Sequence, residues 1–418
     1  MLSNGIRVML EPMDHVRSAS IGFWIKVGSI NETGPLNGVS HFIEHMLFKG
    51  TERRTAKAIA SEIDDLGGEL NAFTSKECTC IYAHVLSEHV SLSIDIVSDM
   101  LMNSIFDANE IEKEKMIILD EINLYDDSPE DLIYDLLSEI TFKGHALQRN
   151  ILGTKKSVTE LTRETMLNFF ELHYQPENIV VAVTGKYDED ELLATLESTV
   201  GQLKQGKSHA RKVAHIPFGN GHIDQKKDSE QLHMIIGFKG YGYDTPELYP
   251  FLLLNNVVGG VSSSRLFQKI REDHGLSYTI DSQPSFYYNS GIFSIYASML
   301  PENLMKVCEL ILEELKLIKA GEVKEEEVCK YRNQLKGSFV LGMEGPTNIM
   351  NWIGKSELLS NRVRPLDEVI SGIENITRSD VIRQANEVFD ANNIAVALVG
   401  KTGEYKSEDV YNFFIENL

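Results

Sequence analysis

Long uncharged apolar runs are missing from this chain of 418 residues. No stretch reaches the ~18 apolar residues that a membrane-spanning helix needs, so we expect no transmembrane segment. The first residues, MLSNGIRVMLEP, lack the charged start, apolar run and cleavage site of a signal peptide, and we interpret them as a strand with a turn. Glycine and proline are modest and 42% of the residues are hydrophobic. This composition predicts a soluble globular protein, long enough for two domains.

Basic residues are also few, with 40 Lys and Arg against 62 Asp and Glu, which gives a formal net charge of -22. Such an acidic chain argues against nucleic acid or an anionic membrane as a partner, and it suits basic ligands. Simple solubility explains the acidity equally well.

Cysteine is scarce: four cysteines in the whole chain do not make a disulfide framework. Cys78 and Cys80 form a C-x-C pair in a strand-like run, but no second pair completes a zinc site. We interpret them as ordinary buried thiols. A reducing cytoplasm is the location that fits this cysteine usage.

One segment of the chain is repeated. Residues 161–186, LTRETMLNFFELHYQPENIVVAVTGK, align without a gap with residues 376–401, ITRSDVIRQANEVFDANNIAVALVGK, at an offset of 215. Each copy has the pattern of a helix, a short turn and a buried strand. The chain is therefore expected to hold two copies of one domain.

The two copies set the expected domain organisation. We predict a first domain over 1–206, a polar, non-periodic linker over 207–230, and a second, homologous domain over 231–418. Strand patterns mix with long helices and do not alternate as regular βαβ units. The predicted fold class is α+β, with each domain a mainly antiparallel sheet that has helices packed on one face.

The stretch GVSHFIEHMLFKGT, residues 38–51, carries the first candidate site. On a helical wheel His41, Glu44 and His45 share one face, and the apolar residues lie behind them. Two imidazoles one turn apart can bind one metal ion, and a glutamate between them can act on water; H-x-x-E-H is the inverse of the H-E-x-x-H zinc motif. By composition alone the pattern should arise in about two of a hundred chains of this length, so a solvated helix face is the alternative.

A catalytic zinc needs a third protein ligand. The segment NEIEKEKMIILDEINLYDD, residues 109–127, has an apolar stripe formed by Ile111, Ile117, Ile118 and Ile122, and Glu114 and Glu121 fall within it. A carboxylate on a core-facing stripe is costly unless it binds a metal ion or a counter-charge. His41 and His45 supply such a reason, so the combined pattern predicts a metal site.

These motifs together resemble the pitrilysin/insulinase family of zinc peptidases. HFIEHMLFKGT, followed some 76 residues later by the glutamate of EKEKMIILDEI, is the family's inverted motif, and the resemblance covers essentially the whole chain. The branch that it resembles is the bacterial relatives of mitochondrial processing peptidase. The resemblance implies that His41, His45 and Glu121 bind one zinc ion per chain, that Glu44 is the general base, and that Glu114 is a supporting carboxylate near the metal.

The resemblance also implies where substrate binds. LNAFTS, residues 70–75, is similar to the edge strand to which substrate backbone adds, with Asn71, Ala72 and Phe73 in contact positions. RLFQKIREDHGLSYTI in the second half is similar to the segment whose arginine and tyrosine, here Arg271 and Tyr278, hold the substrate carbonyl and the transition state. Without the resemblance, Arg271 would be interpreted as a surface charge and Tyr278 as a core aromatic.

The expected function is therefore a zinc endopeptidase that cleaves extended peptides or unfolded segments. We place the mirror of the zinc helix at VVGGVSSSRLFQ, residues 257–268, which has no H-x-x-E-H, so one half is expected to be catalytic. The family encloses substrate between four such domains, which implies a homodimer of this chain. The alternative is a non-catalytic substrate-binding or structural subunit, although such relatives usually lose part of the metal motif.

Overall fold

The computed structural model describes residues 1–206, 216 and 218–418. The chain divides into two compact units, each built around one five-stranded sheet. Unit 1 comprises Met1–Asn123, the described part of Arg149–Val213, and Leu341–Val363. Unit 2 comprises Leu124–Gln148, the described part of Ala214–Val340, and Arg364–Leu418.

The sheet of unit 1 has the strand order β1-β5-β2-β4-β3. β1 runs parallel to β5, and the other three neighbouring pairs are antiparallel. Its centre is apolar and rich in β-branched residues, which favour a pleated buried surface; every residue of β5 is buried. The strands are β1 (Arg7–Pro12), β2 (Ser18–Ile25), β3 (Glu69–Thr74), β4 (Thr79–Leu86) and β5 (Ile179–Gly185).

The sheet of unit 2 repeats this topology in the order β6-β10-β7-β9-β8, again with one parallel pair, β6 with β10. The repeated topology and the 161–186/376–401 alignment agree, since β5 and β10 end the two aligned segments. The strands are β6 (Gly221–Gln225), β7 (Leu232–Gly240), β8 (Ser277–Tyr287), β9 (Ser290–Met299) and β10 (Ile394–Val399). The predicted α+β class with mainly antiparallel sheets is confirmed.

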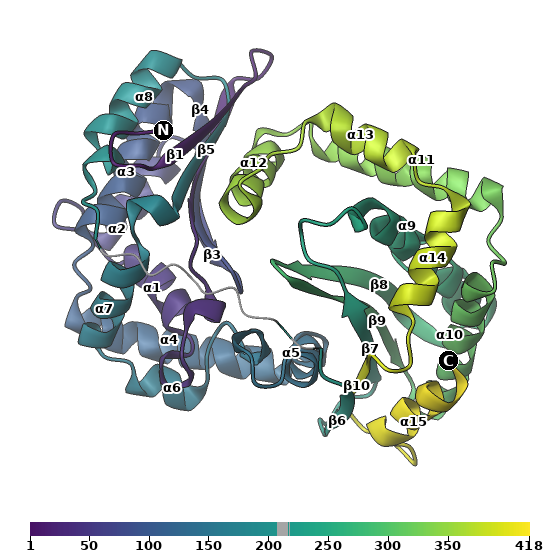
Figure 1. The fold of residues 1–418 in the computed structure, drawn as a ribbon. Helices are drawn as coiled ribbons and strands as arrows, with labels where there is room; N and C mark the ends of the chain where they lie inside the picture. Colours follow the sequence, from purple (N-terminus) through teal and green to yellow (C-terminus); the bar gives the residue numbers. More distant parts are fainter. Residues whose placement is uncertain (207–215, 217) are drawn as a thin grey trace. The chain divides into compact units, whose positions relative to one another are not determined.

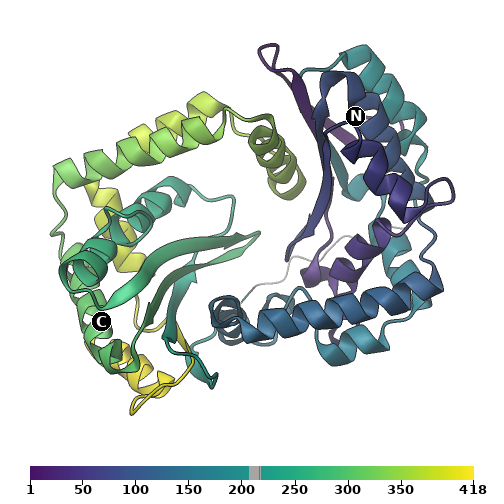
Figure 2. The same ribbon diagram turned by 180° about the vertical axis from the view of Figure 1, so that it is seen from behind.

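Helices surround both sheets (Figures 1 and 2). Those of unit 1 are α1 (Val39–Leu47), α2 (Ala56–Asp64), α3 (Val90–Asn103), most of α4 (Ala108–Asp127), α6 (Lys155–Glu160), α7 (Arg163–His173), α8 (Glu189–Ser198) and α12 (Pro346–Ser360). Those of unit 2 are α5 (Pro129–Thr141), α9 (Leu248–Val258), α10 (Leu304–Lys319), most of α11 (Glu325–Gly342), α13 (Leu366–Glu374), α14 (Arg378–Val388) and α15 (Ser407–Asn417).

Each unit also takes one helix from the other half of the sequence. α12 packs on β2 and β5 of unit 1, and α5 packs on β10 and β7 of unit 2. The packing is close because a glycine faces the helix in each sheet. A Cβ at Gly22 would lie 2.2 Å from Met350 Sδ, and one at Gly237 would lie 2.6 Å from Leu137 Cδ1. These two glycines are 215 residues apart, the same offset as that between the aligned segments. The placement of α12 on one sheet and of α5 on the other is therefore part of the repeated domain structure.

The exchanged helices add a second helical layer that the predicted one-face packing did not include. In unit 2, for example, Phe238 follows Gly237 and points to the opposite face of β7, where its ring lies 5.3 Å from that of Phe389. Because each unit includes a helix from the other half of the sequence, the compact units are discontinuous, unlike the continuous segments 1–206 and 231–418 that we predicted.

The predicted linker, 207–230, is only partly a connection. Its residues 207–215 and 217 lie outside the described residues. The later part contains β6, whose residues from Gly221 pair in parallel with β10. The alternation within GHIDQ is short and its residues are largely exposed, which is typical of an edge strand and hard to distinguish from a loop in sequence.

Two further sequence expectations concern single residue types. Cys78 and Cys80 are free and buried, as predicted, and burial raises the pKa of both thiols. Among the described helices, none combines the length and the apolar character needed to cross a bilayer.

Candidate metal and catalytic site

The first site element is helix α1, which carries the H-x-x-E-H motif. It begins after Gly38, whose φ of 93° is a left-handed conformation that favours glycine at this position. A Cβ at residue 38 would also lie only 2.6 Å from the backbone oxygen of Leu152. The buried Glu32 carboxylate accepts hydrogen bonds from the backbone N–H of Gly38 at 2.8 Å and of Ser40 at 2.9 Å, and from Asn37 Nδ2 at 3.0 Å. A carboxylate at this end of the helix also complements the helix dipole. Glu32 therefore anchors the turn from which His41 projects.

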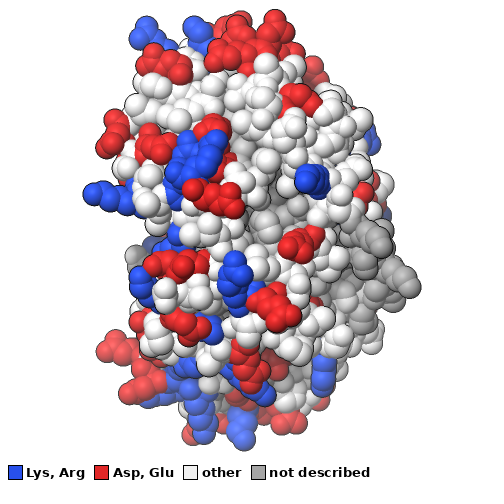
Figure 3. Space-filling view, turned by 90° about the vertical axis from the view of Figure 1, so that its left-hand side faces the viewer, with Lys and Arg blue, Asp and Glu red and all other residues white. Residues whose placement is uncertain are grey.

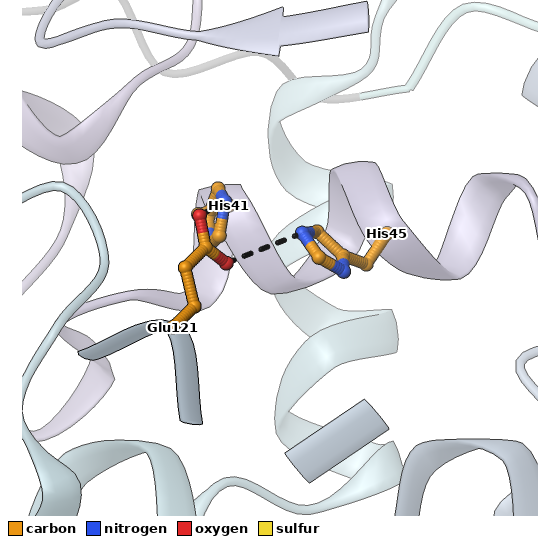
Figure 4. Close-up of side chains that lie close together, drawn as sticks. All are labelled: His41, His45 and Glu121. Carbon is orange, nitrogen blue, oxygen red and sulfur yellow. Dashed lines mark ion pairs between the residues drawn. The ribbon is translucent and has the colours of Figure 1, made fainter. Parts of the chain in front are cut away.

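The two histidines and Glu121 form one cluster within unit 1, drawn in Figure 4. Nε2 of His41 lies 3.7 Å from Oε1 of Glu121, and Nε2 of His45 lies 3.8 Å from Oε2 of the same carboxylate. One ligand atom from each residue lies within 4.8 Å of the others. The structure thus brings together the three residues that the sequence predicted as ligands, from α1 and α4.

The donor set fits a zinc ion. Zinc bonds of ~2.0–2.1 Å in a tetrahedral site place neighbouring ligand atoms ~3.3 Å apart, so the observed spacing needs only small side-chain movements. Burial lowers the pKa of His41 to about 3, and the nearby His45 acts in the same direction. The imidazole of His41 is therefore neutral, as a metal ligand must be.

Glu114 lies behind His45, on the side of the ring that carries Nδ1, and is not part of the cluster of three ligand residues. Its Oε2 lies 3.0 Å from Nδ1 of His45, and its Oε1 lies 2.6 Å from Nζ of Lys49. Its side chain is only 2% exposed. Because the carboxylate accepts from Nδ1, it leaves Nε2 of His45 unprotonated and directed at the metal position, the usual role of such a partner. His41 has no equivalent: its Nδ1 is buried and has no hydrogen-bond partner among the described residues.

This geometry gives the first prediction. Glu114→Gln should weaken zinc binding about 10- to 100-fold, because an amide holds His45 less firmly than a carboxylate does. Glu112→Gln is the matched control, since Glu112 lies on the same helix with a side chain 70% exposed and paired with Lys115. Competition with a fluorescent zinc chelator measures both affinities. Equal affinities for the two variants would contradict the orienting role of Glu114.

Glu44 lies between the two histidines in sequence but outside the ligand cluster. Its Oε2 accepts a hydrogen bond of 2.5 Å from Oγ1 of Thr74. Burial raises the pKa of Glu44, and the Glu121 carboxylate acts in the same direction, while Thr74 and His45 oppose them. A carboxylate with a raised pKa beside a metal position is suited to accept a proton from water.

The predicted substrate strand is the edge strand of its sheet. β3 pairs with β4 on one side, and the described part of unit 1 places no strand on the other. Asn71 Oδ1 accepts a hydrogen bond of 2.8 Å from the N–H of Ala72. Phe73 packs edge-on against Trp24 at 5.5 Å between ring centroids and remains 36% exposed. An exposed edge of this kind can pair with an added strand.

Arg271 and Tyr278 belong to unit 2 and lie close to each other there. Arg271 lies in a π-helical turn, Phe267–Asp273, and its guanidinium lies 4.7 Å from the ring centroid of Tyr278. Tyr278 is 73% exposed, so it is not the core aromatic that its sequence alone would favour. Arg271 also lines a cavity of about 230 Å³ with Asp281, a carboxyl whose pKa burial raises to about 6. The catalytic roles of Arg271 and Tyr278 stay a prediction.

Two details of the sequence interpretation are wrong. Ile117 is 49% exposed, so the buried stripe of α4 is formed by Ile111, Glu114, Ile118 and Ile122. By element order the equivalent of α1 in unit 2 is α9, LYPFLLLNNVV, and not residues 257–268. The consequence is unchanged, because α9 holds no histidine or acidic residue.

Comparison with known proteins adds the family. The model "Insulinase (Peptidase family M16)" matches residues 7–155, and the model "Peptidase M16 inactive domain" matches residues 160–335. An uncharacterized zinc protease of Bacillus subtilis, YmxG, is 38% identical over 404 residues, which is 97% of this chain and 98% of that protein. The chain belongs to the insulinase family, peptidase family M16.

Solved structures show the same fold. A protease from Helicobacter pylori has a TM-score of 0.90 at 21% identity, and covers 96% of this chain and 98% of its own. A peptidase M16 inactive domain from Pseudomonas fluorescens has a TM-score of 0.89 at 19% identity, with 97% and 98% covered. The match of the M16 inactive-domain model agrees with the absence of a metal motif in α9.

Three side chains of this M16 site were not singled out from the sequence. Glu32, Lys49 and Thr74 each contact a site residue or its helix. Glu32 lies six residues before Gly38, outside the Ncap and first-turn positions at which a capping residue is recognised from sequence. The contacts of Lys49 and Thr74 join elements that are distant in sequence, and periodicity does not predict them.

Proposed function

We propose that this chain is a zinc-dependent endopeptidase that hydrolyses peptide bonds in extended peptides or unfolded segments. The observation that carries the proposal is the cluster of His41, His45 and Glu121 with the half-buried Glu44 carboxylate beside it. The relatives named zinc proteases support the zinc and the peptidase class.

The reaction then assigns a task to each residue. Zinc, when bound by His41, His45 and Glu121, would supply a Lewis acid for the scissile carbonyl and the attacking water. Glu44 takes a proton from the water as its oxygen attacks the carbonyl carbon. Glu44 then returns that proton to the amine nitrogen as the C–N bond breaks.

Substrate would bind by adding a strand to β3, next to Asn71, Ala72 and Phe73. Main-chain pairing makes sequence preference loose. Arg271 and Tyr278 are proposed to donate to the developing oxyanion or to neighbouring carbonyls, a role that rests on the family resemblance. The acidic composition would favour peptides with Arg or Lys, although acidic and basic side chains alternate over the face of unit 1 drawn in Figure 3.

The second candidate is a non-catalytic substrate-binding or structural subunit of a processing-peptidase-like complex. The match of 160–335 to an M16 inactive domain favours it, because part of the chain does belong to a non-catalytic class. The complete set of His41, Glu44, His45 and Glu121 in unit 1 favours the enzyme.

Products from a random peptide library, identified by mass spectrometry, test the proposal. An endopeptidase yields internal cleavages that a chelator abolishes. Peptides should be cut and large folded proteins should be poor substrates. A library left intact by the zinc-loaded protein would contradict the enzyme and leave the subunit role.

The working assembly is proposed to be a cytoplasmic homodimer, since two domains per chain supply half of the four that the resemblance implies. Light scattering at micromolar concentration should give a mass near twice 47.1 kDa. A fully active monomer under the same conditions would contradict this assembly.

A further inference from the structure

Thr74, the last residue of β3, touches the candidate general base directly. Its hydroxyl donates the 2.5 Å hydrogen bond to Oε2 of Glu44, and within the described residues no other donor reaches that carboxylate. Oε1 of Glu44 is left free to accept from water. Because Thr74 is the one donor that reaches this half-buried carboxylate within the described residues, its hydrogen bond favours the orientation in which Oε2 faces Thr74.

The backbone of the same residue faces the open edge of the sheet. The N–H of Ser75 donates to the Cys78 carbonyl across the β3–β4 turn, so the N–H of Ser75 points toward β4. N–H groups alternate along a strand, so those of Thr74 and Ala72 point the other way. The bond from the Ala72 N–H to Asn71 Oδ1, a side chain outside the β3–β4 ladder, agrees with this direction.

Thr74 therefore presents its backbone to an added strand and its hydroxyl to Glu44. We propose that Thr74 is a positioning residue that couples strand addition on β3 to the orientation of the Glu44 carboxylate. This inference rests on the proposed peptidase function. A peptide that pairs with β3 restrains the Thr74 backbone, and the hydroxyl transmits that restraint to Oε2, which keeps Oε1 directed at the attacking water.

Thr74→Val tests the proposal because valine keeps the shape and removes the hydroxyl. We expect kcat to fall about 10- to 100-fold, the usual effect of removing a hydrogen bond to a charged group. KM for a short peptide should change less than twofold, and zinc content and the unfolding midpoint should stay as in the wild type. Thr74→Ser, which restores the hydroxyl, should recover most of kcat.

Thr79→Val is the matched control for a merely structural effect. Thr79 lies opposite Thr74 on β4, and its hydroxyl donates to the Val27 carbonyl at 2.9 Å instead of to Glu44. The two threonine hydroxyls lie 3.5 Å apart, so Thr79→Val removes a hydroxyl beside Thr74 while the bond from Thr74 to Glu44 is kept. This variant should lose stability and retain kcat.

Peptide length gives a second readout. In the wild type, kcat should rise as the peptide is lengthened along β3, and in Thr74→Val this rise should disappear. An unchanged kcat in Thr74→Val, no recovery in Thr74→Ser, or the same length dependence in wild type and variant would overturn the coupling alone. Absence of any peptide cleavage by the wild type would overturn the proposed function and the coupling together.

Discussion

Glu44→Gln is expected to lower kcat by about 10²- to 10⁴-fold, the range that a general base contributes. Glutamine has the size of glutamate and can still accept the Thr74 hydrogen bond, but it cannot take a proton from water. The variant should fold and should keep one zinc ion per chain, because Glu44 lies outside the cluster of His41, His45 and Glu121. Steady-state kinetics on a defined peptide, with zinc content by atomic emission, measure both properties.

Glu52→Gln is the control for the charge change alone, since Glu52 is exposed and follows α1 by only a few residues. Loss of zinc from Glu44→Gln would show that Glu44 is a ligand. Full activity would show that another group is the base. Glu114 is then the next candidate for the base, although its two oxygens already contact His45 Nδ1 and Lys49 Nζ.

His45→Ala is expected to have the second large effect, the loss of tight zinc binding. Loss of a partner in the outer shell of a zinc site weakens binding about 10- to 100-fold, so removal of a ligand should cost at least ~10²-fold. Peptide cleavage should fall with it. Zinc should raise the thermal unfolding midpoint of the wild type, because it binds the folded chain, and should leave that of His45→Ala unchanged.

His89→Ala is the matched control, because His89 lies outside the cluster, beside Glu88. Full zinc retention in His45→Ala would show that the ligand assignment is wrong. Cobalt or manganese in place of zinc would change the metal but not the ligands, since imidazole and carboxylate suit these ions as well.

The local parts of the site could be predicted because helical periodicity places side chains on faces. The wheel of residues 38–48 put His41, Glu44 and His45 on one face, and the structure forms α1 there with Val39, Phe42, Ile43 and Met46 buried. The stripe of α4 predicted two buried carboxylates; Glu114 is buried, whereas the side chain of Glu121 is 41% exposed. Both inferences use residues within a few turns of one helix.

Contacts between distant segments could not be predicted in the same way. Residues 346–360 form α12, which packs in the unit of the first half, and the apolar residues of one helix do not indicate which sheet the helix covers. The bond from Thr74 to Glu44 joins residues 30 apart, and Lys49 meets Glu114 across 65 positions. Such contacts follow from tertiary packing, which the local periodicity of a single segment does not reveal.

Hydrolysis of a peptide by the wild-type protein, followed through removal and return of zinc, tests the central claim most directly. The account predicts cleavage by the protein with one zinc per chain, loss of cleavage when a chelator strips the metal, and recovery when stoichiometric zinc is restored. Cleavage that continues at the full rate in the metal-free protein would contradict it. So would a protein that holds zinc at His41, His45 and Glu121 and cleaves no peptide.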